Sequence, residues 1–178
     1  TSTLRDGTWT PTQVLDRGPL ATTFGALAAT PASGGVVVAW TRWQREWTRV
    51  AVRASAVRDG HADPSAVVDA FDIPDVRAGA DVSTPGPPPT HLSVSRSGTP
   101  VLMWDRLVGR APSFAGRLYA SRAGLPGRWS PPQVVQESPT DGWPLAVGAD
   151  GDHLAAAWAD YVSPATGGMR VLASERFG

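Results

Sequence analysis

The chain has 178 residues, no cysteine and a formal net charge of zero, and arginine supplies all of its positive charge. Disulfides and thiolate metal sites are therefore excluded, and the basic surface typical of nucleic-acid-binding proteins is missing. No apolar run reaches the roughly 20 residues of a membrane-spanning helix. With 19 glycines, 17 prolines and few helix-forming residues, the composition favours many short strands joined by turns.

A short phrase near the N-terminus recurs along the chain. The letters WTPTQVL at residues 9–15 return as WSPPQVV at 129–135, and a more divergent version, ADPSAVV, stands at 62–68. Proline within a strand is tolerated where that strand forms the outer edge of a sheet. We therefore predict that these segments are the outer strands of a repeated unit.

Between these phrases, each unit contains the pattern of a hairpin. A first apolar segment is followed by a glycine-marked turn and then by a second apolar segment that closes on tryptophan. The first segments begin at Phe24, His91 and Pro144, and the second segments close on Trp40, Trp104 and Trp158. We expect these tryptophans to occupy equivalent places at the ends of their strands and to serve as packing.

A third segment in each unit, at 48–55, 117–123 and 169–175, alternates polar and apolar residues as a half-buried strand does. Four short antiparallel strands per unit are typical of a β-propeller blade. We predict an all-β fold with about three blades, in a single, partial propeller domain spanning the chain. The predicted units are 1–18, 19–70, 88–137 and 142–178, with a proline-rich connector at 71–90.

The turns before the recurring phrase resemble the Asp-box of sialidase-like propellers (BNR repeats), Ser-x-Asp-x-Gly-x-Thr-Trp. Each copy is degenerate, and the blade rhythm of the whole chain carries the rest of the resemblance. The retained residues are Ser2, Thr8 and Trp9 in the first copy, Ser55 in the second, and Ser121 with Trp129 in the third. The resemblance favours an exported or extracellular protein, and arginine without lysine is typical of a GC-rich bacterial genome.

The same resemblance implies a set of catalytic groups. Sialidase-like enzymes hold a substrate carboxylate with three arginines and use a Tyr–Glu nucleophile pair and an acid/base Asp. This chain has only Tyr119 and Tyr161, and no Glu stands recognisably beside either. No catalytic residue is carried over. We therefore predict a non-catalytic binding or scaffold module, possible ligands being glycans; the alternative is a sialidase-like glycoside hydrolase or a fragment of one.

The predicted binding face is formed by the loops that join the outer strand to the next unit (D–A) and the second strand to the third (B–C). Aromatic rings beside charged groups suit sugar recognition, because the ring stacks on a pyranose while the charges fix its hydroxyls. Solvated loop residues with neighbouring ion pairs are the alternative interpretation. The predicted ligand-binding residues are Arg42, Trp43, Trp47, Asp105, Arg106, Trp143, Asp160 and Tyr161.

Trp43 and Trp47 are expected on this face and outside the core. Arg42 would share the phase of Val38 and Trp40, which indicates that the second strand has already ended. The cover over these two rings would be a ligand or a neighbouring chain.

No metal or cofactor is predicted. The histidines, His61, His91 and His153, are scattered without the spacing of metal ligands. The sequence also lacks a calcium-binding loop, a phosphate-binding loop and a dinucleotide fingerprint.

Three blades are fewer than the four to eight that normally close a propeller. Three alone would leave apolar sheet faces uncovered. We therefore expect a homo-oligomer, with terminal strands exchanged between two copies, or the missing blades of a longer propeller. The start at Thr1, without Met or a signal peptide, is typical of a processed product or a fragment.

Overall fold

The structure is a computed structural model in which every regular element is a β-strand. It describes residues 4–5, 8–9, 12–17, 22–30, 34–44, 49–73, 90–95, 97–110, 113–124, 127–136, 143–150, 153–163 and 168–177. No helix occurs in these ranges, so the predicted all-β class is confirmed. None of the described segments is a long apolar helix of the kind that could cross a membrane.

Sheet 1 is built from five consecutive strands. β3 (Thr22–Thr30), β4 (Gly35–Gln44), β5 (Arg49–Arg58) and β6 (His61–Ala62) are neighbours in that order, and β7 (Ala66–Asp72) also pairs with β5. All pairs are antiparallel. The long strands are rich in Val, Thr and Trp, which suit a pleated, buried surface.

The turn between β5 and β6 shows how local sequence sets a hairpin. Asp59 and Gly60 both have positive φ, at 50° and 77°. A two-residue type I′ turn requires positive φ at both positions, and Asp-Gly adopts it readily. The turn places Arg58 opposite His61.

Sheets 2 and 3 repeat the same antiparallel order. Sheet 2 runs β11–β10–β9–β8, and sheet 3 runs β12–β13–β14. A two-stranded hairpin of β1 and β2 precedes the three sheets. The bounds are β1 (Leu4–Arg5), β2 (Thr8–Trp9), β8 (Thr90–Val94), β9 (Pro100–Arg110), β10 (Ser113–Arg122), β11 (Gln133–Val134), β12 (Trp143–Asp150), β13 (His153–Ser163) and β14 (Gly168–Phe177).

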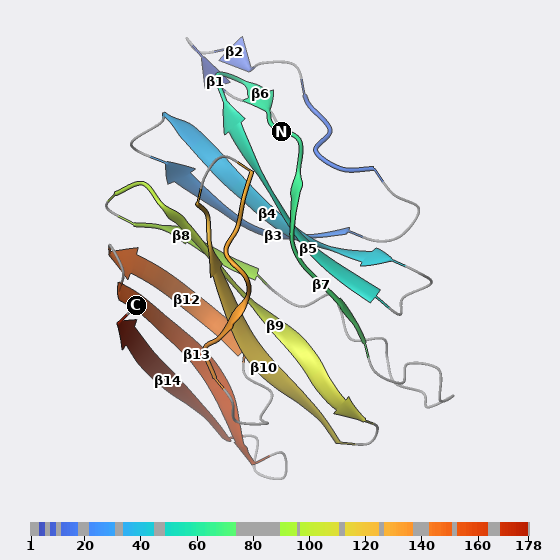
Figure 1. Cartoon of the computed structure of the whole chain (residues 1–178), viewed down its shortest axis with the longest axis vertical. Helices are drawn as coiled ribbons and strands as arrows, with labels where there is room; N and C mark the ends of the chain where they lie inside the picture. Colours follow the sequence, from blue (N-terminus) through green and yellow to red (C-terminus); the bar gives the residue numbers. More distant parts are fainter. Residues whose placement is uncertain are drawn as a thin grey trace.

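The three sheets are stacked one after another in chain order, with sheet 2 in the middle (Figure 1). Their first strands lie together, since β8 contacts both β3 and β12. The core lies at the junctions between sheets, and β9 contributes to two of them. Leu102 and Trp104 face sheet 1, whereas Val101 and Met103 face sheet 3. Sheet 2 is therefore covered on both faces.

The three repeated tryptophans occupy equivalent register positions. Trp40, Trp104 and Trp158 pair with Arg53, Tyr119 and Leu172 on the third strand of their own sheets. All three indoles are buried. The expectation that the strands end at these residues is wrong, because β4, β9 and β13 continue to Gln44, Arg110 and Ser163.

Residues 12–17 form a segment that lies against the far face of sheet 1. Leu15 packs against Val38, Trp40 and Val57, which form a small core of their own. The side-chain amide of Gln13 donates to the carbonyl of Gly60 and accepts from the amide of Ala62 at 2.9 Å. This segment belongs to the first copy of the recurring phrase.

Candidate functional site

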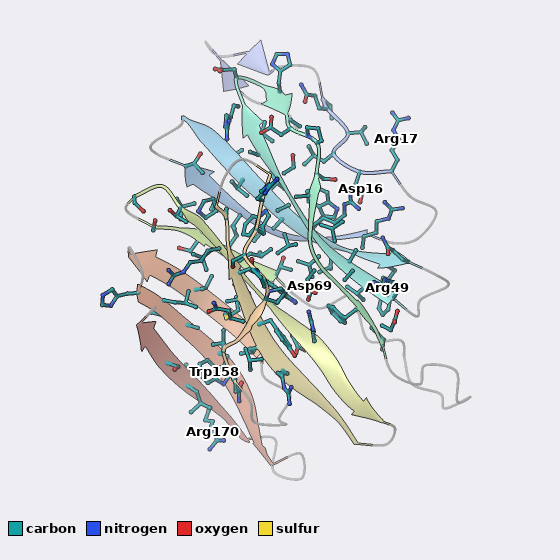
Figure 2. All side chains as sticks on the ribbon, viewed as in Figure 1. Asp16, Arg17, Arg49, Asp69, Trp158 and Arg170 are labelled. Carbon is teal, nitrogen blue, oxygen red and sulfur yellow. The ribbon has the colours of Figure 1, made fainter. Side chains whose placement is uncertain are left out.

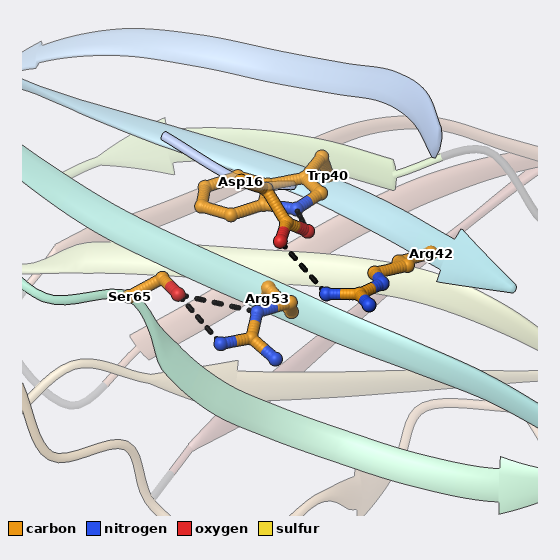
Figure 3. A network of polar contacts seen from close by, with 5 residues as sticks. All are labelled: Asp16, Trp40, Arg42, Arg53 and Ser65. Carbon is orange, nitrogen blue, oxygen red and sulfur yellow. Dashed lines mark hydrogen bonds and ion pairs between the residues drawn. The ribbon is translucent and has the colours of Figure 1, made fainter. Parts of the chain in front are cut away.

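A carboxylate on the N-terminal segment joins two side chains of β4 (Figure 3). Asp16 accepts a hydrogen bond from the indole Nε1 of Trp40 at 2.9 Å and from Nη1 of Arg42 at 2.8 Å. Residues two apart on a strand project from the same face, so one carboxylate reaches both. We refer to Asp16, Trp40 and Arg42 as the Asp16 cluster.

The same arrangement recurs between sheets 1 and 2. Asp69 on β7 accepts from the indole Nε1 of Trp104 at 2.8 Å and from Nε of Arg106 at 2.6 Å, both on β9. A second guanidinium nitrogen, Nη2, pairs with the other carboxylate oxygen. Asp69 is buried at 8% exposure, and its position between sheets is marked in Figure 2. We refer to Asp69, Trp104 and Arg106 as the Asp69 cluster.

Aromatic rings enclose the Arg106 guanidinium. Its central carbon lies 4.1 Å from the ring centre of Tyr119 and 5.1 Å from that of Phe71. Tyr119 in turn stacks on Trp104, with ring centres 6.3 Å apart and an angle of 19° between the planes. Cation–π contact and a bidentate carboxylate together fix Arg106 in place.

The third unit has the repeated tryptophan, Trp158, but not the Asp and Arg that accompany it in the first two units. By sequence register, Gln136 replaces Asp16 and Asp69 after the recurring phrase, and Asp160 replaces Arg42 and Arg106. The indole Nε1 of Trp158 is buried and has no hydrogen-bond partner in the part of the chain that the structure describes. The junction between sheets 2 and 3 is held by apolar packing around Trp158.

Most of the predicted site residues that the structure describes lie on the second strands of successive sheets, close to the repeated tryptophans. Arg42 and Arg106 each follow their tryptophan by two residues and belong to the Asp16 and Asp69 clusters. Asp105 is half-buried on β9, between Trp104 and Arg106. Trp143 lies on β12, and Asp160 and Tyr161 lie on β13, but their side chains are outside the description, as is the whole of Trp47.

The expectation that Trp43 lies outside the core is wrong. Trp43 is 1% exposed and packs in the junction of sheets 1 and 2. It shares the phase of Val37 and Ala39, not that of Val38 and Trp40. The error came from assuming one buried face for β4, whereas β4 is covered on both. A ring this buried offers no surface to a ligand.

Sequence reasoning missed the role of the two aspartates. Asp16 and Asp69 each follow the recurring phrase directly, after QVL and AVV respectively. Trp-x-Arg occurs at both partner positions, in Trp40–Arg42 and Trp104–Arg106. An Asp directly after the recurring phrase, together with Trp-x-Arg on the next second strand, was the sequence signal from which both clusters could have been predicted.

A cleft of about 240 Å³ lies between sheets 1 and 2, at the end opposite the predicted loop face. Residues at the turns that follow the first and third strands of sheet 2 contribute to its lining. About half of the lining residues are Ala, Pro, Val or Trp. Its main polar and aromatic lining residues are Thr30, Ser55, Arg58, Asp63 and Trp129. This space is small and largely apolar, and polar groups lie at its rim.

The described side chains contain no group of three His, Asp or Glu residues that could hold a metal ion. His91, on the first strand of sheet 2, has a pKa lowered below its ordinary value of 6.5 because burial disfavours the charged ring. Comparison of the chain with protein-family models, with curated proteins and with solved structures finds no match.

Proposed function

We propose that the chain is a non-catalytic binding or scaffold module, and that its three sheets are blades of a sialidase-like β-propeller. The stacking of the sheets and the proximity of β3, β8 and β12 support the blade interpretation, since the first strands of blades surround a common axis. The degenerate Asp-boxes support it from the sequence.

One observation carries the non-catalytic assignment. The two arginines predicted for the ligand site already bind carboxylates of this chain, Arg42 to Asp16 and Arg106 to Asp69. Tyr119 is likewise engaged, as a stacking partner of Trp104 and Arg106. These contacts fix Arg106 at the junction of sheets 1 and 2 and hold the N-terminal segment against sheet 1 through Arg42, without a bound substrate.

Glycans are the ligand class that we propose for the module. In the sequence, the predicted D–A and B–C loops bring Trp47 and Trp143 next to charged residues, which is a composition suited to glycans. The cleft lined by Arg58 and Trp129 is the second proposed place for a sugar edge. Both combine an aromatic ring with charged groups.

A glycan array, read beside hydrolysis of a fluorogenic sialoside and other aryl glycosides, tests this function. We expect binding without turnover. Trp47→Ala should abolish binding if the loop face is the site, and Arg58→Ala should do so if the cleft is. Turnover that disappears in Asp105→Asn, a substitution outside both the Asp16 and Asp69 clusters, would contradict the proposal and establish a sialidase-like hydrolase.

A further inference from the structure

Sheet 3 has an apolar outer face that is exposed. The equivalent faces of sheets 1 and 2 are buried. Val171 is 70% exposed, whereas Val52 and Leu118, at the same register position in β5 and β10, are 0% exposed. Ala155 is exposed, while Val101 at the equivalent place in β9 is 0% exposed. Sheet 2 covers this face of sheet 1, and sheet 3 covers this face of sheet 2.

The residues on this face are small. Ala146, Ala155, Ala157 and Ala173 line a shallow hollow of about 590 Å³. Small side chains leave room for the larger residues of another sheet to pack closely. The face is thus shaped as one half of a sheet-to-sheet junction.

The outer edge of sheet 3 is also open within the described part of the chain. The third strands of sheets 1 and 2 carry an outer strand in a shared register. Arg53 pairs with Val67 and Ala54 with Ala66, just as Tyr119 pairs with Val134 and Ala120 with Gln133. The equivalent residues of β14, Leu172 and Ala173, pair only with β13.

The N-terminal segment, residues 12–17, resembles an outer strand that lacks a third strand to pair with among the described residues. By sequence and by the contacts of Asp16, residues 12–17 correspond to an outer strand, yet they pair with no third strand among the described residues. Val14, the counterpart of Val67 and Val134, is 60% exposed. The segment and β14 lie at opposite ends of the stack of sheets (Figure 1), so one chain does not join them.

We propose that β14 and the open face of sheet 3 bind residues 12–17 of a second copy of this chain, together with the face of sheet 1 that this segment covers. The repeat fixes the register: Leu172 opposite Val14 of the second copy, and Ala173 opposite Gln13. Two such junctions, related by a twofold axis, close six sheets into a ring. This interface rests on the blade arrangement proposed above.

A hydrogen bond that is repeated in sheets 1 and 2 predicts one further contact. Ser55 and Ser121 each donate to a carbonyl three residues before the outer-strand partner, Asp63 and Ser130, at 2.7 Å in both cases. Ser174 is the equivalent residue of β14 and is exposed. In the assembly its hydroxyl would donate to the carbonyl of Thr10 of the second copy.

The β1–β2 hairpin competes with this assembly. Leu4 opposite Trp9 and Arg5 opposite Thr8 repeat the register of the β5–β6 hairpin. β1 therefore occupies the place that the end of β14 would take, and it must leave before a second copy binds. Deleting residues 1–5 should accelerate and strengthen the association.

Sedimentation velocity of wild type, Val171→Asp and Val67→Asp tests the interface. Val67 is the matched control, since it is 53% exposed on an outer strand that the assembly does not cover. We expect a wild-type dimer, a Val171→Asp monomer whose far-UV circular dichroism spectrum matches that of the wild type, and a Val67→Asp dimer. A wild type that stays monomeric, or a Val171→Asp protein that still dimerises, would overturn the proposal.

Disulfide trapping tests the register, because the chain has no cysteine of its own. Mixing Gln13→Cys with Ala173→Cys under oxidation should give a cross-linked heterodimer. Gln133→Cys, whose strand is already paired with β10, should give none with Ala173→Cys. Glycan binding by the monomeric Val171→Asp variant separates this interface from the proposed function, since either can fail while the other holds.

Discussion

At the junction of sheets 1 and 2, Asp69 holds both Trp104 and Arg106, whereas at the junction of sheets 2 and 3 the indole N–H of Trp158 is buried without a hydrogen bond in the described structure. The register of the tryptophans is nevertheless the same in both sheets. Apolar packing is thus sufficient to build the repeat, and the Asp–Trp–Arg arrangement adds polar specificity to one junction. A buried donor without a partner costs roughly 1–3 kcal/mol, which the second junction bears.

The largest effect that we expect is at Trp43, in the core of the first junction. Trp43→Ala should lower the free energy of unfolding by about 3–5 kcal/mol, because it removes a 1% exposed ring. Chemical denaturation measures the loss, with Val67→Ala as an exposed control. A change below about 1 kcal/mol would mean that the ring is not in the core.

The next effect compares the two junctions directly. Trp104→Phe should cost about 1.5 kcal/mol more than Trp158→Phe, since only Trp104 donates to a carboxylate. Both substitutions remove the same volume from a buried strand, so the packing terms largely cancel. Equal losses in denaturant unfolding would remove the distinction between the junctions.

A smaller effect should follow from giving the second junction the polar groups of the first. Gln136→Asp combined with Asp160→Arg should stabilise the protein by about 1 kcal/mol, because Trp158 would gain an acceptor and the new Arg a carboxylate. Each single substitution serves as the control, and each should destabilise. If the double variant is no more stable than either single one, the two junctions differ in more than these groups.

The smallest effect concerns His91. Its pKa is lowered by burial, so the unfolded state binds more protons between the folded pKa and 6.5. Stability should therefore fall as the pH drops from neutrality through that window. His91→Gln should flatten this part of the curve of unfolding midpoint against pH, and an unchanged slope would assign it to another group.

The sequence predicted the parts of the fold that depend on repetition. Glycine-marked turns and apolar segments located the hairpins, and the register of Trp40, Trp104 and Trp158 followed from their spacing. The sequence-based prediction failed for β4, because this strand is covered on one face by sheet 2 and on the other by the N-terminal segment. Trp43 was placed outside the core because the strand was assumed to have a single buried face.

The pairing of Asp69 with Arg106 was not predicted from the sequence for a related reason. Asp69 and Arg106 are separated by 37 positions in the chain, and their pairing depends on how two sheets stack. A single sequence shows a carboxylate and a guanidinium but not which sheet each one faces. The sequence therefore predicted Arg42 and Arg106 as ligand-binding residues, whereas their ion pairs with Asp16 and Asp69 are visible only in the structure.

Asp69 and Arg106 form a structural link between sheets 1 and 2. A double-mutant cycle of Asp69→Ala and Arg106→Ala, measured by denaturant unfolding, tests it most directly. We expect each single variant to lose about 3 kcal/mol, because its partner is left buried without a counter-charge, and the double variant to lose clearly less than the sum. Strictly additive losses, or single variants that keep wild-type stability while losing a ligand, would show that this pair does not link the sheets.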